Sequence, residues 1–205
     1  MRRRASGLQT PGLRNSFNGY LNDPTPLPIR RTADLLIGRQ SIPGATYFVT
    51  LCETNRHPAL LDPPVALEIR NSLDRLHASD DFTLIAATVM PDHVHLLGVL
   101  GPRLSISRLI GKFKADTHRV LRPRGLEWQE NFYEHRLRDG NETEPFARYI
   151  FLNPYRAKLI GLSKKWPLWR RWGDVRFAFE AMVAQTNSVP SAWIDESDPA
   201  GAADL

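Results

Sequence analysis

Residues 82–100 read FTLIAATVMPDHVHLLGVL, and this stretch decides the fold. Two runs rich in β-branched and apolar residues, Phe82–Met90 and His93–Leu100, are typical of strands. Between them, Pro91 and Asp92 favour a tight turn. The stretch therefore predicts two consecutive strands that are joined by a short turn.

The segments on both sides of this pair alternate between helical and strand patterns. Ala45–Leu51 is rich in β-branched and aromatic residues, whereas the apolar residues of Ser105–Leu121 recur at helical intervals. The elements predicted outside the pair are a strand over 45–51, a helix over 63–77, a helix over 105–121, a strand over 127–137 and a helix over 141–156, capped by Asn141 or Thr143. This order predicts an α+β domain with an antiparallel sheet.

The composition predicts one domain with loose ends. The chain has 205 residues, which suits a single globular domain with additional terminal segments. Residues 1–40 are rich in Arg, Pro, Gly and Asn, so we expect a flexible basic arm, whose arginines either touch phosphates or are solvated. We expect the folded domain that carries the function over residues 41–178 and a C-terminal tail over 179–205.

The charge and the cysteine content narrow the class of partner and compartment. A net charge of +5 favours a polyanionic partner, of which nucleic acid is the commonest. The one cysteine, Cys52, cannot form an internal disulfide, so a secreted scaffold is not expected. We find no apolar run of about 20 residues for a membrane span and no signal-peptide core, and we therefore expect a cytoplasmic protein without a membrane partner.

Two histidines in the second strand of the pair form the first candidate site. Because His93 and His95 are two residues apart on a strand, they point to the same face of the sheet. Val94 and Leu96 point to the other face, into a core. Two neutral imidazoles at this spacing can bind one divalent metal ion, but paired histidines on a sheet surface are also common. Spacing alone leaves both interpretations open.

The predicted helix over 141–156 carries the second candidate site. Tyr149 and Asn153 are four residues apart and share one helical face. A tyrosine hydroxyl can attack phosphorus, and an asparagine carbonyl can supply an oxygen ligand to a metal. The alternative is that Tyr149 is a half-buried aromatic that packs the helix on the sheet. Tyr155 falls on a different face, which favours a single nucleophile, and Pro154 predicts a kink at Asn153.

Four segments in order resemble one known family. Residues 90–97 read MPDHVHLL, 128–135 read WQENFYEH, and 148–157 read RYIFLNPYRA, while 44–50 read GATYFVT. They resemble the paired-histidine motif, the Trp-Gln segment, the catalytic helix and the first strand of the REP-associated tyrosine transposases. These are single-tyrosine transposases of the HUH family. The resemblance covers roughly residues 42–175, and three ordered motifs make it specific.

The resemblance implies a fold and a mechanism. The family fold is a ferredoxin-like antiparallel sheet with packed helices. His93, His95 and Asn153 would hold Mg²⁺ or Mn²⁺, and Tyr149 would attack single-stranded DNA to give a 5′-phosphotyrosine and a free 3′-hydroxyl. The implied substrate is a DNA hairpin from a repetitive extragenic palindrome, which is cleaved and rejoined by a nucleoid-associated protein. The sequence leaves a monomer and a homodimer equally open.

Basic residues in the middle and late parts of the chain are candidate DNA ligands. Contacts with phosphates give salt-sensitive affinity, and aromatic rings can stack on unpaired bases. Trp166 and Trp169 lie in a basic segment, where they either stack on bases or close the edge of the core. The predicted DNA-binding residues are Arg108, Lys112, Arg119, Arg136, Arg138, Arg170 and Arg171.

Two other functions compete with the strand-transfer enzyme. One is a domesticated DNA-hairpin-binding protein that has lost strand transfer. The other is a metal-dependent phosphodiesterase in which water is the nucleophile, so that no protein–DNA adduct forms and the enzyme turns over repeatedly.

Overall fold

The computed structural model describes residues 41–138, 143–196 and 199, which all lie in one compact unit. The arm expected over residues 1–40 lies outside the described residues. The strands found in the described part are β1 (Thr46–Cys52), β2 (Phe82–Val89), β3 (His93–Leu100), β4 (Tyr133–Arg136) and β5 (Trp169–Arg171). The helices are α1 (Pro63–Ala78), α2 (Ile106–Leu121), α3 (Glu144–Arg156) and α4 (Ala178–Thr186), with short 3-10 turns η2 (Arg122–Arg124) and η3 (Ser191–Trp193).

The strands form one antiparallel sheet in the order β4-β1-β3-β2-β5. β3 lies in the middle of the sheet, where Thr50 of β1 and Thr88 of β2 flank His95 as its register partners. A bulge between Leu84 and Ala86 shifts the register of β2 against β3. The predicted α+β class with a ferredoxin-like antiparallel sheet is confirmed.

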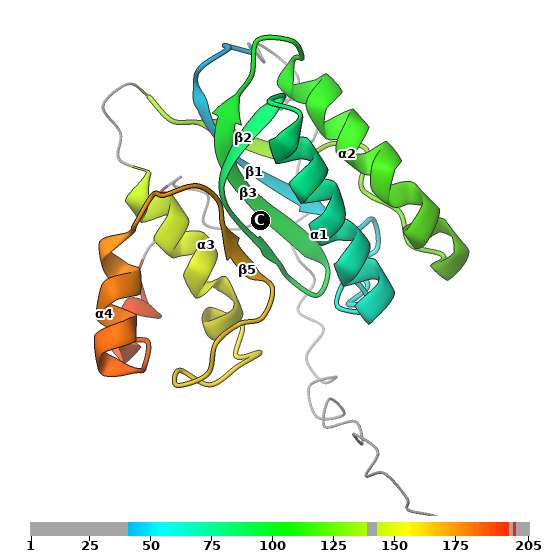
Figure 1. The fold of residues 1–205 in the computed structure, drawn as a ribbon. Coiled ribbons are helices and arrows are strands. Elements are labelled where there is room, and N and C mark those ends of the chain that lie inside the picture. Colours follow the sequence, from blue (N-terminus) through cyan, green and yellow to red (C-terminus); the bar gives the residue numbers. More distant parts are fainter. Residues whose placement is uncertain (1–40, 139–142, 197–198, 200–205) are drawn as a thin grey trace, which may run out of the picture. The chain divides into compact units, whose positions relative to one another are not determined.

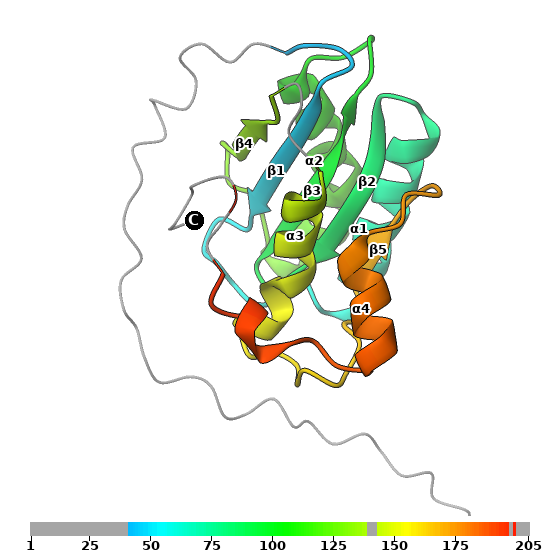
Figure 2. The same cartoon turned by 90° about the vertical axis from the view of Figure 1, so that its left-hand side faces the viewer.

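The helices cover the two faces of this sheet in pairs (Figures 1 and 2). α1 and α2 pack on one face over a core that includes Val94 and Leu96 of β3. α3 and α4 pack on the other face, where Phe48, Ala86 and Leu97 point. The alternation of side chains along β3 therefore sends the odd-numbered residues, the histidines included, towards α3.

The ends of the helices agree only in part with the expected capping. Ser105 caps α2, since its hydroxyl accepts a hydrogen bond from the backbone N–H of Arg108. Thr143 occupies the N-cap position of α3, as one of the two predicted caps, but its side chain makes no capping bond; Asn141 lies outside the described residues. α3 continues through Pro154 to Arg156, where the helix was expected to end, and the kink expected at Asn153 stays a prediction.

Three elements differ from the expected ones. The strand expected over 127–137 is shorter, and Trp128 only forms an isolated bridge with Glu53. The buried carboxylate of Glu53 accepts the backbone N–H groups of Asn55 and His57, so the chain turns here instead of extending the pairing. Residues 169–171 and 178–186, for which no element was expected, form β5 on the edge of β2 and helix α4.

A buried carboxylate joins the turn after α1 to α2. Asp81 accepts hydrogen bonds from Ser79 at 3.0 Å, from Arg103 at 3.0 Å and from Lys112 at 2.7 Å. The bond from Lys112, together with those from Ser79 and Arg103, holds the pKa of Asp81 below its usual value of 3.8 although burial opposes this. Asp81 therefore stabilises the fold in its ionised form.

We expect Asp81→Asn to lower the free energy of unfolding at pH 7 by about 2 kcal/mol, because charged hydrogen bonds are lost. Since the folded pKa is depressed, the stabilisation is present above pH 3.8 and disappears as the pH falls through the folded value. The difference in the free energy of unfolding between wild type and variant, measured by urea unfolding, should therefore be smaller at pH 3 than at pH 7. Asp116→Asn, at an exposed position of α2, is the control. A gap that stays constant with pH would contradict this account.

Candidate active site

The paired histidines of β3 face each other on the side of the sheet that carries α3. The Nε2 atoms of His93 and His95 lie 3.1 Å apart, and the two rings are nearly perpendicular. Val94 and Leu96 are fully buried on the opposite face. The prediction that the two imidazoles share a face is confirmed, and their Nε2 atoms converge on one point.

His95 is held from behind by β1. Its Nδ1 lies 2.9 Å from the hydroxyl of Thr50, its register partner, and both side chains are buried. Burial lowers the pKa of His95 well below 6.5, the neighbouring His93 lowers it further, and a hydrogen bond with the Asn153 side chain acts in the opposite direction. His95 is therefore neutral at pH 7, which is the form of imidazole that binds metals.

His93 is held by the carboxylate of Asp92, which in turn pairs with Arg56. Its Nδ1 lies 2.6 Å from Oδ1 of Asp92, and Nε of Arg56 binds the other carboxylate oxygen at 2.9 Å. Burial opposes ionisation of Asp92, but the hydrogen bond and charge of His93 and the charge of Arg56 outweigh it and lower the pKa of Asp92 from 3.8. Asp92 is thus an anion that accepts a hydrogen bond from Nδ1 of His93. Nε2 of His93 then points at His95.

Helix α3 brings Tyr149 and Asn153 to these histidines. The ring of Tyr149 lies edge-on to His95, with 5.9 Å between ring centroids, and at 5.8 Å from Phe48. Asn153 donates from Nδ2 to the carbonyl of Tyr149 at 2.9 Å, which fixes its amide, and its side chain also bonds to His95. The structure brings together all four residues that the sequence predicted for the catalytic and metal site.

The donor atoms at this point fit a divalent cation. The described residues hold no cluster of three His, Cys, Asp or Glu side chains suited to a metal ion. Asn153, whose side chain contacts His95, offers a donor of another kind, an amide oxygen. Nitrogen and oxygen donors of this kind suit divalent cations, and hydrogen bonds to Nδ1 of both rings are the usual support of histidine ligands.

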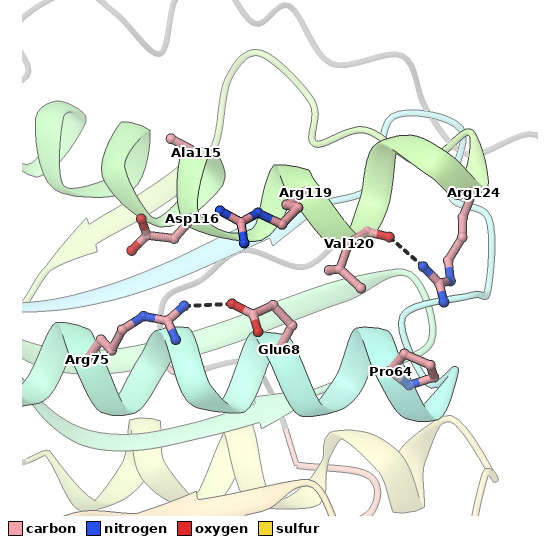
Figure 3. A pocket seen from close by; sticks show the side chains of 8 residues that line it. All are labelled: Pro64, Glu68, Arg75, Ala115, Asp116, Arg119, Val120 and Arg124. Atoms are coloured by element: carbon pink, nitrogen blue, oxygen red, sulfur yellow. Dashed lines mark hydrogen bonds and ion pairs between the residues drawn. The ribbon is translucent and has the colours of Figure 1, made fainter.

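The predicted DNA ligands do not gather around this site. Arg108, Lys112 and Arg119 lie on α2, across the sheet from Tyr149, and Lys112 binds Asp81. Arg119 lines a groove of about 650 Å³ between α1 and α2, together with Arg75 and Arg124 (Figure 3). Within the described residues, the guanidinium groups of Arg108, Arg119, Arg136 and Arg138 make no hydrogen bond or ion pair, and all four side chains are exposed.

The basic residues of β5, Arg170 and Arg171, and the neighbouring Trp169 are held by contacts within the protein. Arg170 pairs with Asp74 at 2.6 Å and stacks on Trp172, while Arg171 pairs with Glu180 at 3.2 Å. The ring of Trp169 packs edge-on against Phe151 on the α3 side of the sheet. The contacts of Trp169 favour the interpretation that it closes the edge of the core. The predicted roles of these arginines in DNA binding remain predictions.

Besides Asp92, which was expected only in a turn, sequence reasoning missed Thr50 as a site residue. It lies in the strand-forming run of β1, and only its alignment opposite His95 reveals its role. We expect Thr50→Val to lower the free energy of unfolding by about 1–3 kcal/mol, because the buried Nδ1 of His95 loses its partner. Thr50→Ser keeps the hydroxyl and should retain most of the stability in the same denaturant series. A loss in Thr50→Ser with none in Thr50→Val would show that the methyl group, and not the hydrogen bond, matters.

Comparison with known proteins gives related transposases. Residues 41–140 match the family model described as transposase IS200 like. The chain is 29% identical over 133 residues to a REP-associated tyrosine transposase of Escherichia coli K12, which covers 63% of this chain and 78% of that protein. It is 26% identical over 139 residues to a Haemophilus influenzae protein named as a candidate member of the same group, covering 60% and 78% of the two chains.

A solved structure shares the fold. The structure of a REP-associated tyrosine transposase bound to a REP hairpin aligns with a TM-score of 0.56 and 24% identity, over 78% of this chain and 88% of that one. No described helix is long and apolar enough to cross a membrane. Residues 41–140 are thus similar to the IS200-like transposases, and the chain is similar in sequence to REP-associated tyrosine transposases and shares the fold of one of them, which supports a DNA transposase role.

Proposed function

We propose that this transposase is a metal-dependent endonuclease that cleaves and rejoins single-stranded DNA at palindromic hairpins through a covalent 5′-phosphotyrosine on Tyr149. The observation that carries the proposal is the convergence of His93, His95 and Asn153 beside the ring of Tyr149. The relative whose structure contains a REP hairpin supports a hairpin as the substrate. The mechanism, the metal and the residue roles are parts of the proposal.

The proposed metal ligands are Nε2 of His93, Nε2 of His95 and the amide oxygen of Asn153, for Mg²⁺ or Mn²⁺. When bound, such an ion draws charge from the scissile phosphate and fixes its geometry. The chain prepares this site in advance, because Asp92 and Thr50 hold the Nδ1 atoms of the two rings. Neutral His95 needs no deprotonation at pH 7.

Tyr149 is the proposed nucleophile, and the products follow from its attack. Its hydroxyl oxygen forms a bond to phosphorus while the bond from phosphorus to the 3′ oxygen breaks. The phenolic proton leaves to solvent and the 3′ oxygen takes up a proton, which gives a 5′-phosphotyrosine and a 3′-hydroxyl. Because one phosphodiester replaces another, a 3′-hydroxyl can attack the adduct in reverse and rejoin the strand.

We expect Tyr149→Phe to abolish the covalent product while hairpin binding persists. The measurement is a denaturing gel of labelled hairpin DNA with Mn²⁺, with fluorescence anisotropy for affinity, and the hairpins are taken from palindromic repeats flanking the gene. A Mn²⁺-dependent adduct in the wild type alone establishes the nucleophile. Tight binding without cleavage by the wild type would support a hairpin-binding protein. Repeated cleavage without an adduct would support a phosphodiesterase that uses water.

We expect Asp92→Asn to weaken Mn²⁺ binding about 10–100-fold, which is typical for loss of the partner behind a histidine ligand. The reason is that an amide does not hold the Nδ1 proton of His93 as a carboxylate does. Isothermal titration of Mn²⁺ into the DNA-free protein measures the effect. Asp116→Asn, on the opposite layer, should bind Mn²⁺ as the wild type does. If both variants match the wild type, Asp92 does not support a metal ligand.

A further inference from the structure

Residues 191–196, near the end of the described chain, contact α3, the helix that carries Tyr149. We propose that Arg156 is a positioning residue for Tyr149, and that residues 191–196 fix Arg156 in place. The inference deepens the function proposed above, because it concerns the same nucleophile. It assigns a role to a segment in which no functional residue was expected.

Arg156 lies directly over the ring of Tyr149. The two residues are seven apart on α3, which is about two turns, so they share one helical face. The central guanidinium carbon lies 5.2 Å from the ring centroid. A guanidinium at this distance is attracted to the electron-rich face of an aromatic ring. Together with the edge-on contacts to Phe48 and His95, it limits the orientations that the phenol can adopt.

The guanidinium is itself held by backbone carbonyls of the C-terminal segment. Nε of Arg156 donates to the carbonyl of Ile194 at 3.1 Å, and Nη2 donates to the carbonyl of Trp193 at 3.1 Å. Because the guanidinium is a rigid planar fork, two such bonds fix the plane of the group and not only its position. An arginine that is otherwise flexible is thereby kept over Tyr149.

A second arginine of α3 anchors the same segment. Arg148 pairs with Glu196 at 2.7 Å, and its guanidinium stacks on Trp193 with 5.3 Å to the ring centroid. The start of the segment is fixed by Val189, which is buried and donates its N–H to the carbonyl of Leu162. In Figure 2 the chain leaves α4 and crosses to the C-terminal end of α3. The segment therefore holds α3 at two positions that flank Tyr149 in the sequence.

The orientation of the phenol affects the rate of attack more than the affinity for DNA. An in-line attack requires the hydroxyl oxygen to approach phosphorus along one direction, and an error of about 1 Å can cost about 100-fold in rate. Arg156 contacts the ring of the nucleophile and is not one of the proposed metal ligands. Loss of Arg156 should slow the chemical step while DNA and metal binding stay unchanged.

The test is the single-turnover rate of adduct formation with Mn²⁺ and a labelled hairpin. We expect Arg156→Met to be about 10–100-fold slower, with hairpin affinity and Mn²⁺ affinity within about twofold of the wild type. Arg156→Lys keeps the charge over the ring but not the planar fork, so its rate should be intermediate. Arg148→Met should slow the reaction less, because it loosens the segment but leaves the guanidinium of Arg156 over the ring. Arg70→Met, exposed on α1, is the matched control and should react as the wild type does.

A second readout needs neither DNA nor metal. In protein labelled with 3-fluorotyrosine, Tyr149→Phe identifies the ¹⁹F signal of Tyr149 among those of the five tyrosines. We expect Arg156→Met and Arg148→Met, but not Arg70→Met, to shift or broaden this signal. If wild type forms no adduct, the proposed function fails, and the ¹⁹F spectra still decide the positioning. A normal or faster rate in Arg156→Met, or an unchanged Tyr149 signal, would overturn the inference.

Discussion

The pairing of β3 with β1 is the constraint on which the site depends. In this register Thr50 lies opposite His95 and Cys52 lies opposite His93, on the face that α3 covers. Because side chains alternate along a strand, a slip by one residue would turn both histidines into the apolar core under α1 and α2. Val94 and Leu96, fully buried on that face, make such a slip unfavourable. The apolar residues between the histidines therefore determine where the histidines point.

Register alone directs the rings to one face, and hydrogen bonds then select the nitrogen that faces the site. Thr50 and Asp92 occupy Nδ1 of the two imidazoles, so that the two Nε2 atoms meet at 3.1 Å. The support of Asp92 comes from Arg56, whose backbone has a positive φ of 56°. Few non-glycine residues adopt this conformation. It occurs here in the turn after β1, from which the side chain of Arg56 reaches Asp92.

The sequence predicted the elements whose pattern is local, and it missed the contacts between distant segments. The central strands, α1, α2 and the shared face of Tyr149 and Asn153 follow from periodicity over a few turns. β5 has three residues, which is too short for a pattern, and it exists because β2 offers an edge. The bond between His95 and Thr50 spans 45 residues, and that between Arg156 and Ile194 spans 38. Only the assembled fold brings such partners together.

The sheet also limits how one DNA molecule can use the basic residues. Arg108 and Arg119 are exposed residues of α2. The sheet lies between α2 and α3, the helix that carries Tyr149 (Figure 1). A phosphate at the hydroxyl of Tyr149 cannot touch either arginine. If these arginines bind DNA, they contact a part of the substrate that is well separated from the cleaved bond. A hairpin with a flanking single strand has one part that can lie at the cleaved bond and another that can lie far from it. A short unpaired strand is too small to provide both. In the proposed reaction, the α2 arginines would therefore bear only on the recognition of the larger substrate, and the cleavage chemistry would take place on the α3 face alone.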